Sequence, residues 1–494
     1  MPSKGIEVYS YISPEVQDVK INFSVPGTAE SHQSGGSVEN RVQVRHLEIE
    51  SKAIPGEFNF SGKFAWNVQR GNSPDFLAGG YNFINSLSGN IEHGTMLSTV
   101  SGPSVFVEDL IITYGFYDAG SGVAGLTDRD QFWVSITVNH SSWMTELVVP
   151  GTESELEPFS RFVLCAPHDP GMNSLQNAQT VINGVDSTKA IEFAAHIPFV
   201  DELGKHVGTF ALHNLLPHLV EALAVTQKDT ISSMLALGAR YFEFRPAYIL
   251  NDLLADERAP LPNVLYFHHA CIPGLMYDHF LADIVSFLDE HPNEIVTIHI
   301  RWDGIPSECR KPTPAELTDV MNTALGKSST SLQVGNIDHL KAPIKTLRVS
   351  GTRLICLTEA QKYDSYTNEA YGTLSATSII KQLATMNTAG QANNPITVLQ
   401  CQATPQRLKD VVIYSVLASN AATSSLMETK PRMDQETLPW VEEHALKNLK
   451  AEESIILMND FMDGRTTDLG IKMSAQRFAE SGLSRGVEGL SVDG

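Results

Sequence analysis

After residue 160 the chain alternates between short apolar runs and helical segments, and this alternation limits the possible folds more than any other feature. Segments such as 278–288 carry apolar residues at i, i+3 and i+4, as an amphipathic helix does. Strands that alternate with helices favour parallel pairing and, at this length, a closed (β/α) barrel. The predicted strands cover 162–166, 240–246, 263–268, 295–301, 353–358, 396–401 and 454–459.

The first 150 residues follow a different pattern, in which apolar and polar residues alternate. Phe64, Trp66 and Val68 are separated by polar or small residues, and 132–138 repeats the same period of two. This period is typical of half-buried strands and predicts an all-β, sandwich-like domain. We therefore expect an all-β domain over 1–150, an acidic linker over 151–160 and a barrel over 161–494.

Composition limits the partners that this chain can bind. The formal net charge of −22 argues against nucleic acid, and against more than transient contact with an anionic membrane surface. The five cysteines are odd in number and widely spaced, which predicts free thiols rather than a disulfide framework. The N-terminal residues lack the apolar core of a signal peptide, so we expect a cytoplasmic protein, with secretion left open if a leader is missing.

Reactive residues follow the ends of several predicted strands. His168 and Asp169 come directly after the first strand, and His269 ends the strand that begins at 263. Arg301 and Asp460 stand at the ends of two later strands. Because parallel strands of a barrel end on one face, these side chains are predicted to share a site.

The predicted second strand adds a carboxylate and a guanidinium. Glu243 and Arg245 lie two residues apart, so both side chains point to the same face of the strand. One interpretation is a structural ion pair. The other is that Arg245 binds phosphate oxygens through its planar fork of donors.

Two histidines at one opening can act as an acid and a base. We predict His168 as general base and His269 as general acid, with His268 packed or turned outward. Asp460 is predicted to orient His168, although it could instead cap the helix that follows.

Four stretches together resemble the motifs of the phosphatidylinositol-specific phospholipase C family. His168–Met172 is similar to its His-Asp-Ser-Gly signature, and Gly238–Arg245 to its Gly-hydrophobic-Arg-aromatic-aromatic-Asp-hydrophobic-Arg strand. Tyr266–His269 resembles its His-His-Gly motif, and Phe287–Val296 its Phe-Leu-x-x-x-Pro-x-Glu motif. Order and spacing both match, firmly over 160–305 and loosely beyond it.

This resemblance implies a distorted (β/α) barrel of the TIM type that cleaves a phosphodiester by internal attack. His168 would remove a proton from the hydroxyl beside the phosphodiester, and His269, held by Asp169, would protonate the leaving alcohol. Arg245 would stabilise charge on the phosphate oxygens. The products would be a cyclic phosphate and an alcohol, so the substrate needs a neighbouring hydroxyl, as on inositol.

The resemblance also bears on metal use. Calcium-dependent members of that family carry Asn after the first histidine and Glu-x-Asp on the second strand, whereas this chain has Asp169 and Glu243-Phe-Arg245. A cation at Arg245 would repel Ca²⁺ and leave it short of oxygen ligands. The sequence therefore resembles the metal-independent branch, and we predict no metal and no cofactor.

Several positions depart from the family pattern. Pro170 replaces serine, Glu243 replaces Asp, and Ala270 and Cys271 replace Gly-Pro. Residues 358–359, Thr and Glu, stand about where bacterial members have basic residues.

The remaining predicted binding residues lie after the fourth strand. Arg301 would retain one cation with Asp303 beside it, and with Glu243 these residues are predicted to bind substrate. A site with few basic groups suits a polyphosphorylated headgroup poorly. A plain inositol phospholipid, a glycosylated anchor and another small phosphodiester remain as substrates.

The sequence therefore predicts a metal-independent phosphodiesterase or lyase on an α/β barrel. Two alternatives remain. One is a Mg²⁺-dependent phosphodiester transferase that uses Glu243 and another acid on the same barrel. The other is a non-catalytic protein that binds a phospholipid or another ligand.

Overall fold

The computed structural model shows a mixed α/β protein with several sheets. It describes residues 5–35, 42–49, 62–120, 122, 125–185, 187–197, 214–254, 260–405 and 425–488. Within these ranges ten strands come first, and strands alternating with helices follow.

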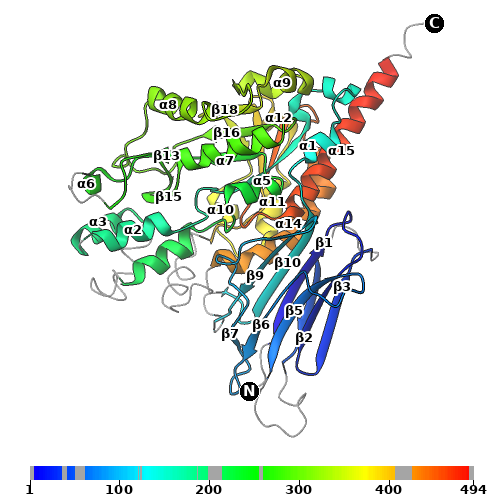
Figure 1. The fold of residues 1–494 in the computed structure, drawn as a ribbon, viewed down its shortest axis with the longest axis vertical. Coiled ribbons are helices and arrows are strands. Elements are labelled where there is room, and N and C mark those ends of the chain that lie inside the picture. Colours follow the sequence, from blue (N-terminus) through cyan, green and yellow to red (C-terminus); the bar gives the residue numbers. More distant parts are fainter. Residues whose placement is uncertain are drawn as a thin grey trace.

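The N-terminal strands form two five-stranded sheets, drawn in blue to cyan in Figure 1. Apolar residues from both sheets, including Phe23, Phe64, Trp66 and Phe132, form one buried cluster. The sequence's alternating pattern is explained by this packing, because each strand turns one face to the opposite sheet. The strand order across the first sheet is β4 (Gln43–Leu47), β1 (Ile6–Ile12), β10 (Asp130–Val138), β9 (Leu110–Tyr117) and β8 (Val105–Val107). The order across the second sheet is β3 (Thr28–Gln33), β2 (Val19–Val25), β5 (Lys63–Arg70), β6 (Ala78–Ile84) and β7 (Ile91–Gly94).

β10 differs from the predicted half-buried strand, because both of its faces are buried. Ser135 and Thr137 alternate with the core residues, yet they are 3% and 1% exposed. The start of α15 (Gly464–Glu488) covers this outer face, and a Cβ atom on Gly464 would lie only 2.1 Å from Thr137 Oγ1. Close contact with the rest of the chain therefore buries a face that the sequence marks as polar.

The later strands form two four-stranded parallel sheets. An isolated parallel bridge between Cys165 and Ala239 links them, so the strands that carry His168 and Arg245 are neighbours. The strand order in one sheet is β11 (Val163–Pro167), β21 (Ser454–Asn459), β20 (Ile396–Gln400) and β19 (Lys362–Asp364). The order in the other is β12 (Tyr241–Phe244), β16 (Val296–Ile300), β18 (Leu354–Thr358) and β17 (Val334–Gly335).

This arrangement differs from the predicted closed barrel. Within the described ranges no ladder joins β19 to β17 or β18, so the parallel strands leave an open side. The predicted strand that ends in His269 also leaves the parallel set. It is β14 (Tyr266–His269), which pairs antiparallel with β13 (Pro246–Ala247) and β15 (Ile272–Met276). β19, which the sequence did not predict, completes the parallel set beside β20.

Helices flank the parallel sheets, as Figure 1 shows. The predicted amphipathic helix is α7 (Tyr277–Glu290), and the other predicted helix is α5 (Ile231–Ala236), capped by the Thr230 side chain. The structure also shows α1 (Trp143–Leu147), α2 (Gln176–Gly184), α3 (Ser187–Ala195), α6 (Asn251–Leu254), α8 (Pro314–Leu325), α9 (Ile344–Ser350), α10 (Asn368–Tyr371), α11 (Ala376–Leu383), α12 (Thr388–Gln391) and α14 (Ser425–Asn448).

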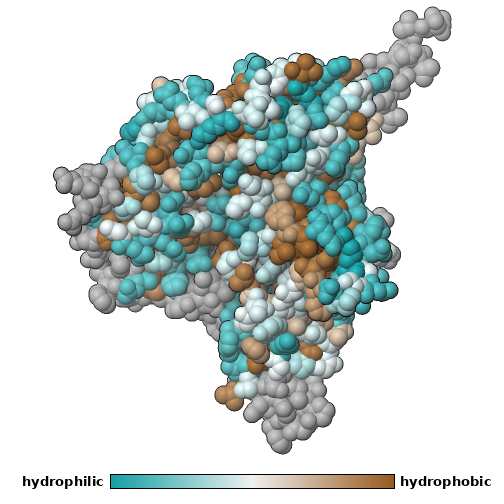
Figure 2. Space-filling view, viewed as in Figure 1, coloured by the Kyte–Doolittle hydropathy of each residue, from teal (hydrophilic) through white to brown (hydrophobic). Residues whose placement is uncertain are grey.

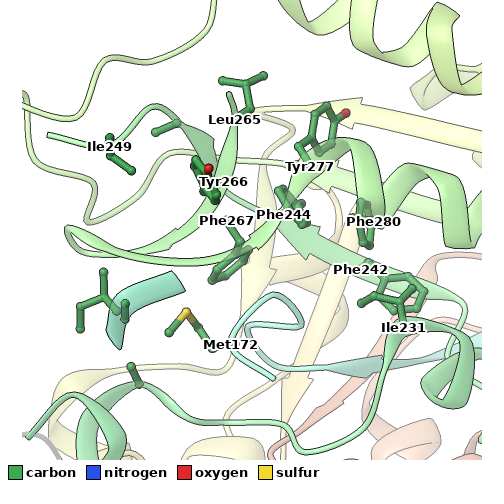
Figure 3. Packing of buried hydrophobic residues seen from close by; sticks show 14 of the residues in the cluster. Met172, Ile231, Phe242, Phe244, Ile249, Leu265, Tyr266, Phe267, Tyr277 and Phe280 are labelled. Atoms are coloured by element: carbon green, nitrogen blue, oxygen red, sulfur yellow. The ribbon is translucent and has the colours of Figure 1, made fainter. Parts of the chain in front are cut away.

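Figure 3 shows a buried cluster that includes the aromatic residues Phe244, Phe267 and Phe280. Phe244 stacks on Phe280 of α7 at a centroid distance of 4.5 Å and meets the edge of Phe267 at 5.2 Å. Phe244 precedes Arg245, and Phe267 precedes the two histidines. This packing therefore fixes the two strand ends relative to each other.

Three properties of the described residues complete the account of the fold. All five cysteines are free, as predicted, with Cys356 half-buried and the others buried. Hydrophilic residues cover much of the face seen in Figure 2, with hydrophobic residues scattered among them. None of the described helices combines the length and apolar character that crossing a bilayer requires.

Candidate functional site

The site begins where β11 and β21 end side by side. Their parallel register places Pro167 opposite Asn459, so the next residues, His168 and Asp460, are neighbours. His168 Nδ1 lies 2.8 Å from Asp460 Oδ1. This bond puts the proton on Nδ1 and leaves Nε2 free to accept one, as a general base requires. Asp460 also precedes α15, but its carboxylate contacts the imidazole.

A tight approach between two loops brings His269 to the same place. Gly171 lies so close to Phe267 that a Cβ atom added to the glycine would come within 2.3 Å of the Cβ atom of Phe267. Asp169 lies two residues before Gly171, and His269 two residues after Phe267. The absence of a side chain at Gly171 is therefore what allows the loops after β11 and β14 to meet.

Asp169 stands at the centre of the group. Its Oδ1 accepts a hydrogen bond from the Arg245 guanidinium, which follows β12. Its Oδ2 lies 3.8 Å from His168 Nε2 and 3.9 Å from His269 Nε2. Both distances are longer than hydrogen bonds, so Arg245 and not His269 is the direct partner of this carboxylate. Two imidazoles and a guanidinium thus surround one anion.

Burial controls the protonation of these groups. Desolvation, with the charge of Arg245 and then His168, lowers the pKa of His269 to about 3. Burial raises the pKa of Asp460, while its bond to His168 opposes that rise. His269 is therefore neutral at pH 7 in the free protein.

His268 differs from its neighbour in position. It is fully buried, and desolvation lowers its pKa to about 4. His269 keeps 13% of its side chain exposed and faces Asp169. Of the two, only His269 is placed to meet a ligand.

The backbone at the site adopts an uncommon conformation. Asp169, Ala270 and Phe461 have φ angles of 45°, 52° and 42°, in the left-handed region that non-glycine residues rarely adopt. Each follows directly after one of the three candidate acid-base residues. Strained backbone gathers at functional sites, where surrounding contacts hold it in place.

A second charged group surrounds Glu243. Its Oε1 accepts a hydrogen bond from Lys362 Nζ at 2.7 Å and lies 3.4 Å from Arg301. Arg301 also pairs with Asp303, an exposed residue. Lys362 reaches Asp364 at 2.8 Å. Glu243 is therefore paired with these cations and not with Arg245.

Lys362 and Asp364 were missed by sequence reasoning. They lie on β19, which has only three residues and no apolar alternation. The usable signal was the spacing of two charges on either side of Tyr363, which puts both on one face of a strand. Lys362 supplies a basic group beside Glu243 that the sequence did not lead us to expect. Burial, together with Glu243, raises the pKa of Asp364 to about 6.

Two carboxylates of the site are paired with cationic side chains. Asp169 bonds to Arg245, and Glu243 to Lys362. Among the described residues, no group of three or more His, Cys, Asp or Glu is arranged to hold a metal ion.

Comparison with known proteins gives only distant likenesses. No protein-family model matches the chain, and no curated protein is significantly similar. A phosphatidylinositol-specific phospholipase C from Listeria monocytogenes is 13% identical, with a TM-score of 0.37, over 68% of this chain and 99% of that one. A mutant of the corresponding Staphylococcus aureus enzyme is 12% identical, with a TM-score of 0.41, over 68% and 96%. At this level of identity and TM-score the likeness decides nothing about the activity of this chain.

Proposed function

We propose that this protein is a metal-independent phosphodiesterase of the phospholipase C type, which cleaves its substrate by attack of a neighbouring hydroxyl. The observation that carries the proposal is the convergence of His168 and His269 on one Asp169 oxygen, with Arg245 on the other. Two proton-transfer groups and one fixed cation are the parts that such a reaction needs.

His168 is the base of the proposed reaction. With Nδ1 bonded to Asp460, its Nε2 takes the proton from the substrate hydroxyl as that oxygen attacks phosphorus. The new P–O bond closes a cyclic phosphate, and the bond to the leaving alcohol breaks. Arg245 stabilises the charge on the non-bridging oxygens. No water enters this step.

His269 donates the proton that the leaving alcohol requires. Its pKa of about 3 in the free protein means that it gains this proton only when the site changes. A phosphodiester anion beside Arg245 offsets the guanidinium charge, which raises the pKa of His269. Substrate binding and protonation of the acid are therefore coupled.

The group around Glu243 is the proposed binding site for the rest of the headgroup. Arg301, Lys362 and Asp303 surround it with donors and acceptors of mixed charge. Such a surface suits the hydroxyls of a polyol better than further phosphates, because two of its cations are already paired. A phospholipid headgroup such as phosphatidylinositol is the proposed substrate.

Phosphorus NMR of a phosphatidylinositol digest tests the proposal. We expect a cyclic inositol phosphate as first product, with and without EDTA. His168→Asn should abolish its formation, whereas His279→Asn, which changes an exposed histidine of α7, should not. Activity lost in EDTA would favour the Mg²⁺-dependent transferase, and ligand binding without turnover would favour a binding protein.

A further inference from the structure

Segment 226–229 passes directly behind the candidate catalytic loops, and Gln227 joins them. Its side-chain Nε2 donates to the carbonyl oxygens of His168 at 2.9 Å and Asn459 at 3.0 Å. Its Oε1 accepts from the backbone N–H of Met462 at 3.0 Å. One buried amide thus holds the backbone of the loop that carries the base and of the loop that carries Asp460.

Thr226 holds the same two loops from the adjacent position. Its hydroxyl lies 3.0 Å from the carbonyl oxygen of His168 and 3.2 Å from that of Asp169. Its own carbonyl accepts the N–H of Phe461 at 2.7 Å. Asp169 and Phe461 are two of the residues with left-handed backbone, so this segment helps to hold their conformations.

The next two residues enter the N-terminal β domain. Lys228 Nζ donates to the carbonyl oxygens of Gly102 and Tyr114, and lies 5.2 Å from the ring centroid of Trp133 on β10. Asp229 accepts from the Ser104 backbone N–H at 2.7 Å and from its hydroxyl at 2.8 Å. Ser104, Lys228 and Asp229 are buried, so their bonds are costly to leave unmade.

We propose that segment 226–229 couples the N-terminal sheets to the catalytic loops, and that Gln227 is a positioning residue for His168 and Asp460. In this arrangement the β domain is a support for the site. Lys228 and Asp229 fix the segment to the β domain, and Gln227 transmits that position to the two loops. The effect on turnover rests on the proposed function, but the effect on the geometry of His168 does not.

Kinetics of four variants of the full chain test the coupling. Gln227→Met keeps the side-chain length and removes the three bonds, so kcat should fall by about tenfold or more with KM nearly unchanged. Lys228→Met and Asp229→Asn should lower kcat in the same way. The matched control is Tyr11→Phe, which removes a different contact between the two regions, its 2.7 Å bond to Asp468. It should leave kcat unchanged.

A double-mutant cycle separates coupling from general weakening. If Lys228 acts through Gln227, Lys228→Met should cause little further loss in the Gln227→Met background. Fully additive losses would overturn the proposal. Should Lys228→Met fail to fold, Asp229→Asn takes its place in the cycle.

The tautomer of His168 gives a readout that needs no substrate. Nitrogen-15 shifts report whether Nδ1 carries the proton, as its bond to Asp460 requires. Asp229→Asn and Gln227→Met should reduce that tautomer, and Tyr11→Phe should not. An unchanged tautomer in both variants would overturn the coupling even in an active enzyme. If the wild-type protein cleaves no phosphodiester, the proposed function is refuted. The tautomer of His168 then still decides whether segment 226–229 couples the β domain to the loops.

Discussion

Arg245→Met should raise the pKa of His269 while it abolishes most of the activity. In the unsubstituted protein the Arg245 guanidinium neutralises Asp169, whose Oδ2 lies 3.9 Å from His269 Nε2. At an effective dielectric constant of about 20, an uncompensated carboxylate at this distance favours an imidazolium by about 4 kcal/mol, or roughly three pKa units. His168 lies 3.8 Å from the same oxygen and shares that field. We therefore expect the pKa of His269 to rise from about 3 by roughly one to three units.

Histidine Cε1–H shifts, followed by NMR from acid to alkaline pH, measure this change. His269→Asn assigns the resonance, and Arg310→Met is the control, because it removes the same charge from an exposed pair with Glu316. Turnover should fall by about 10²–10³-fold, since phosphate charge loses its fixed donor. If His269 still titrates near pH 3 in Arg245→Met, the electrostatic account of the site is wrong.

Three further predictions concern catalysis, stability and pH. Asp460→Asn should lower kcat by about 10²–10⁴-fold with little change in folding, because it misplaces the imidazole proton of His168. Steady-state kinetics measure the loss, and circular dichroism checks that the variant is folded. Glu294→Gln should cost about 3–5 kcal/mol of unfolding free energy, because Glu294 and Arg240 form a pair that is 0% exposed on both sides. Glu30→Gln, at the exposed pair with Arg45, should cost less than about 1 kcal/mol in the same urea titration. His268 is neutral when folded, so unfolding takes up a proton as pH falls below its unfolded pKa. The contribution of His268 to stability should therefore decrease from about pH 6.5 toward the folded pKa of about 4, by roughly 3 kcal/mol, and His268→Asn should lack this contribution while it keeps that of His269, whose pKa is also lowered.

The sequence could predict those pairs of site residues that depend only on strand register and on which strands are neighbours. The apolar runs before His168 and Asp460 marked two parallel strands, and parallel strands end at one edge, so their meeting could be predicted. The same reasoning predicted that Arg245 would face this edge. It also predicted that α7 would pack an apolar face, which it does through Phe280 and its neighbours.

Other features depended on distances that no local pattern records. Asp169 was expected to hold His269, yet it bonds to Arg245, because the guanidinium comes within hydrogen-bond reach and the imidazole stops at 3.9 Å. Lys362 joined the site from a strand too short to show a period. Ser135 and Thr137 read as a solvent face, but α15 covers them.

Strand periodicity and side-chain type are local properties, so the sequence alone predicts which residues follow strand ends and which chemistry they offer. Tertiary structure alone decided how those residues pair, where the parallel sheets stay open and how Lys228 and Asp229 reach the N-terminal sheets. The physical reason is that an ion pair or a buried hydrogen bond depends on separations of a few tenths of an ångström. Those separations are set by the packing of segments that lie far apart along the chain.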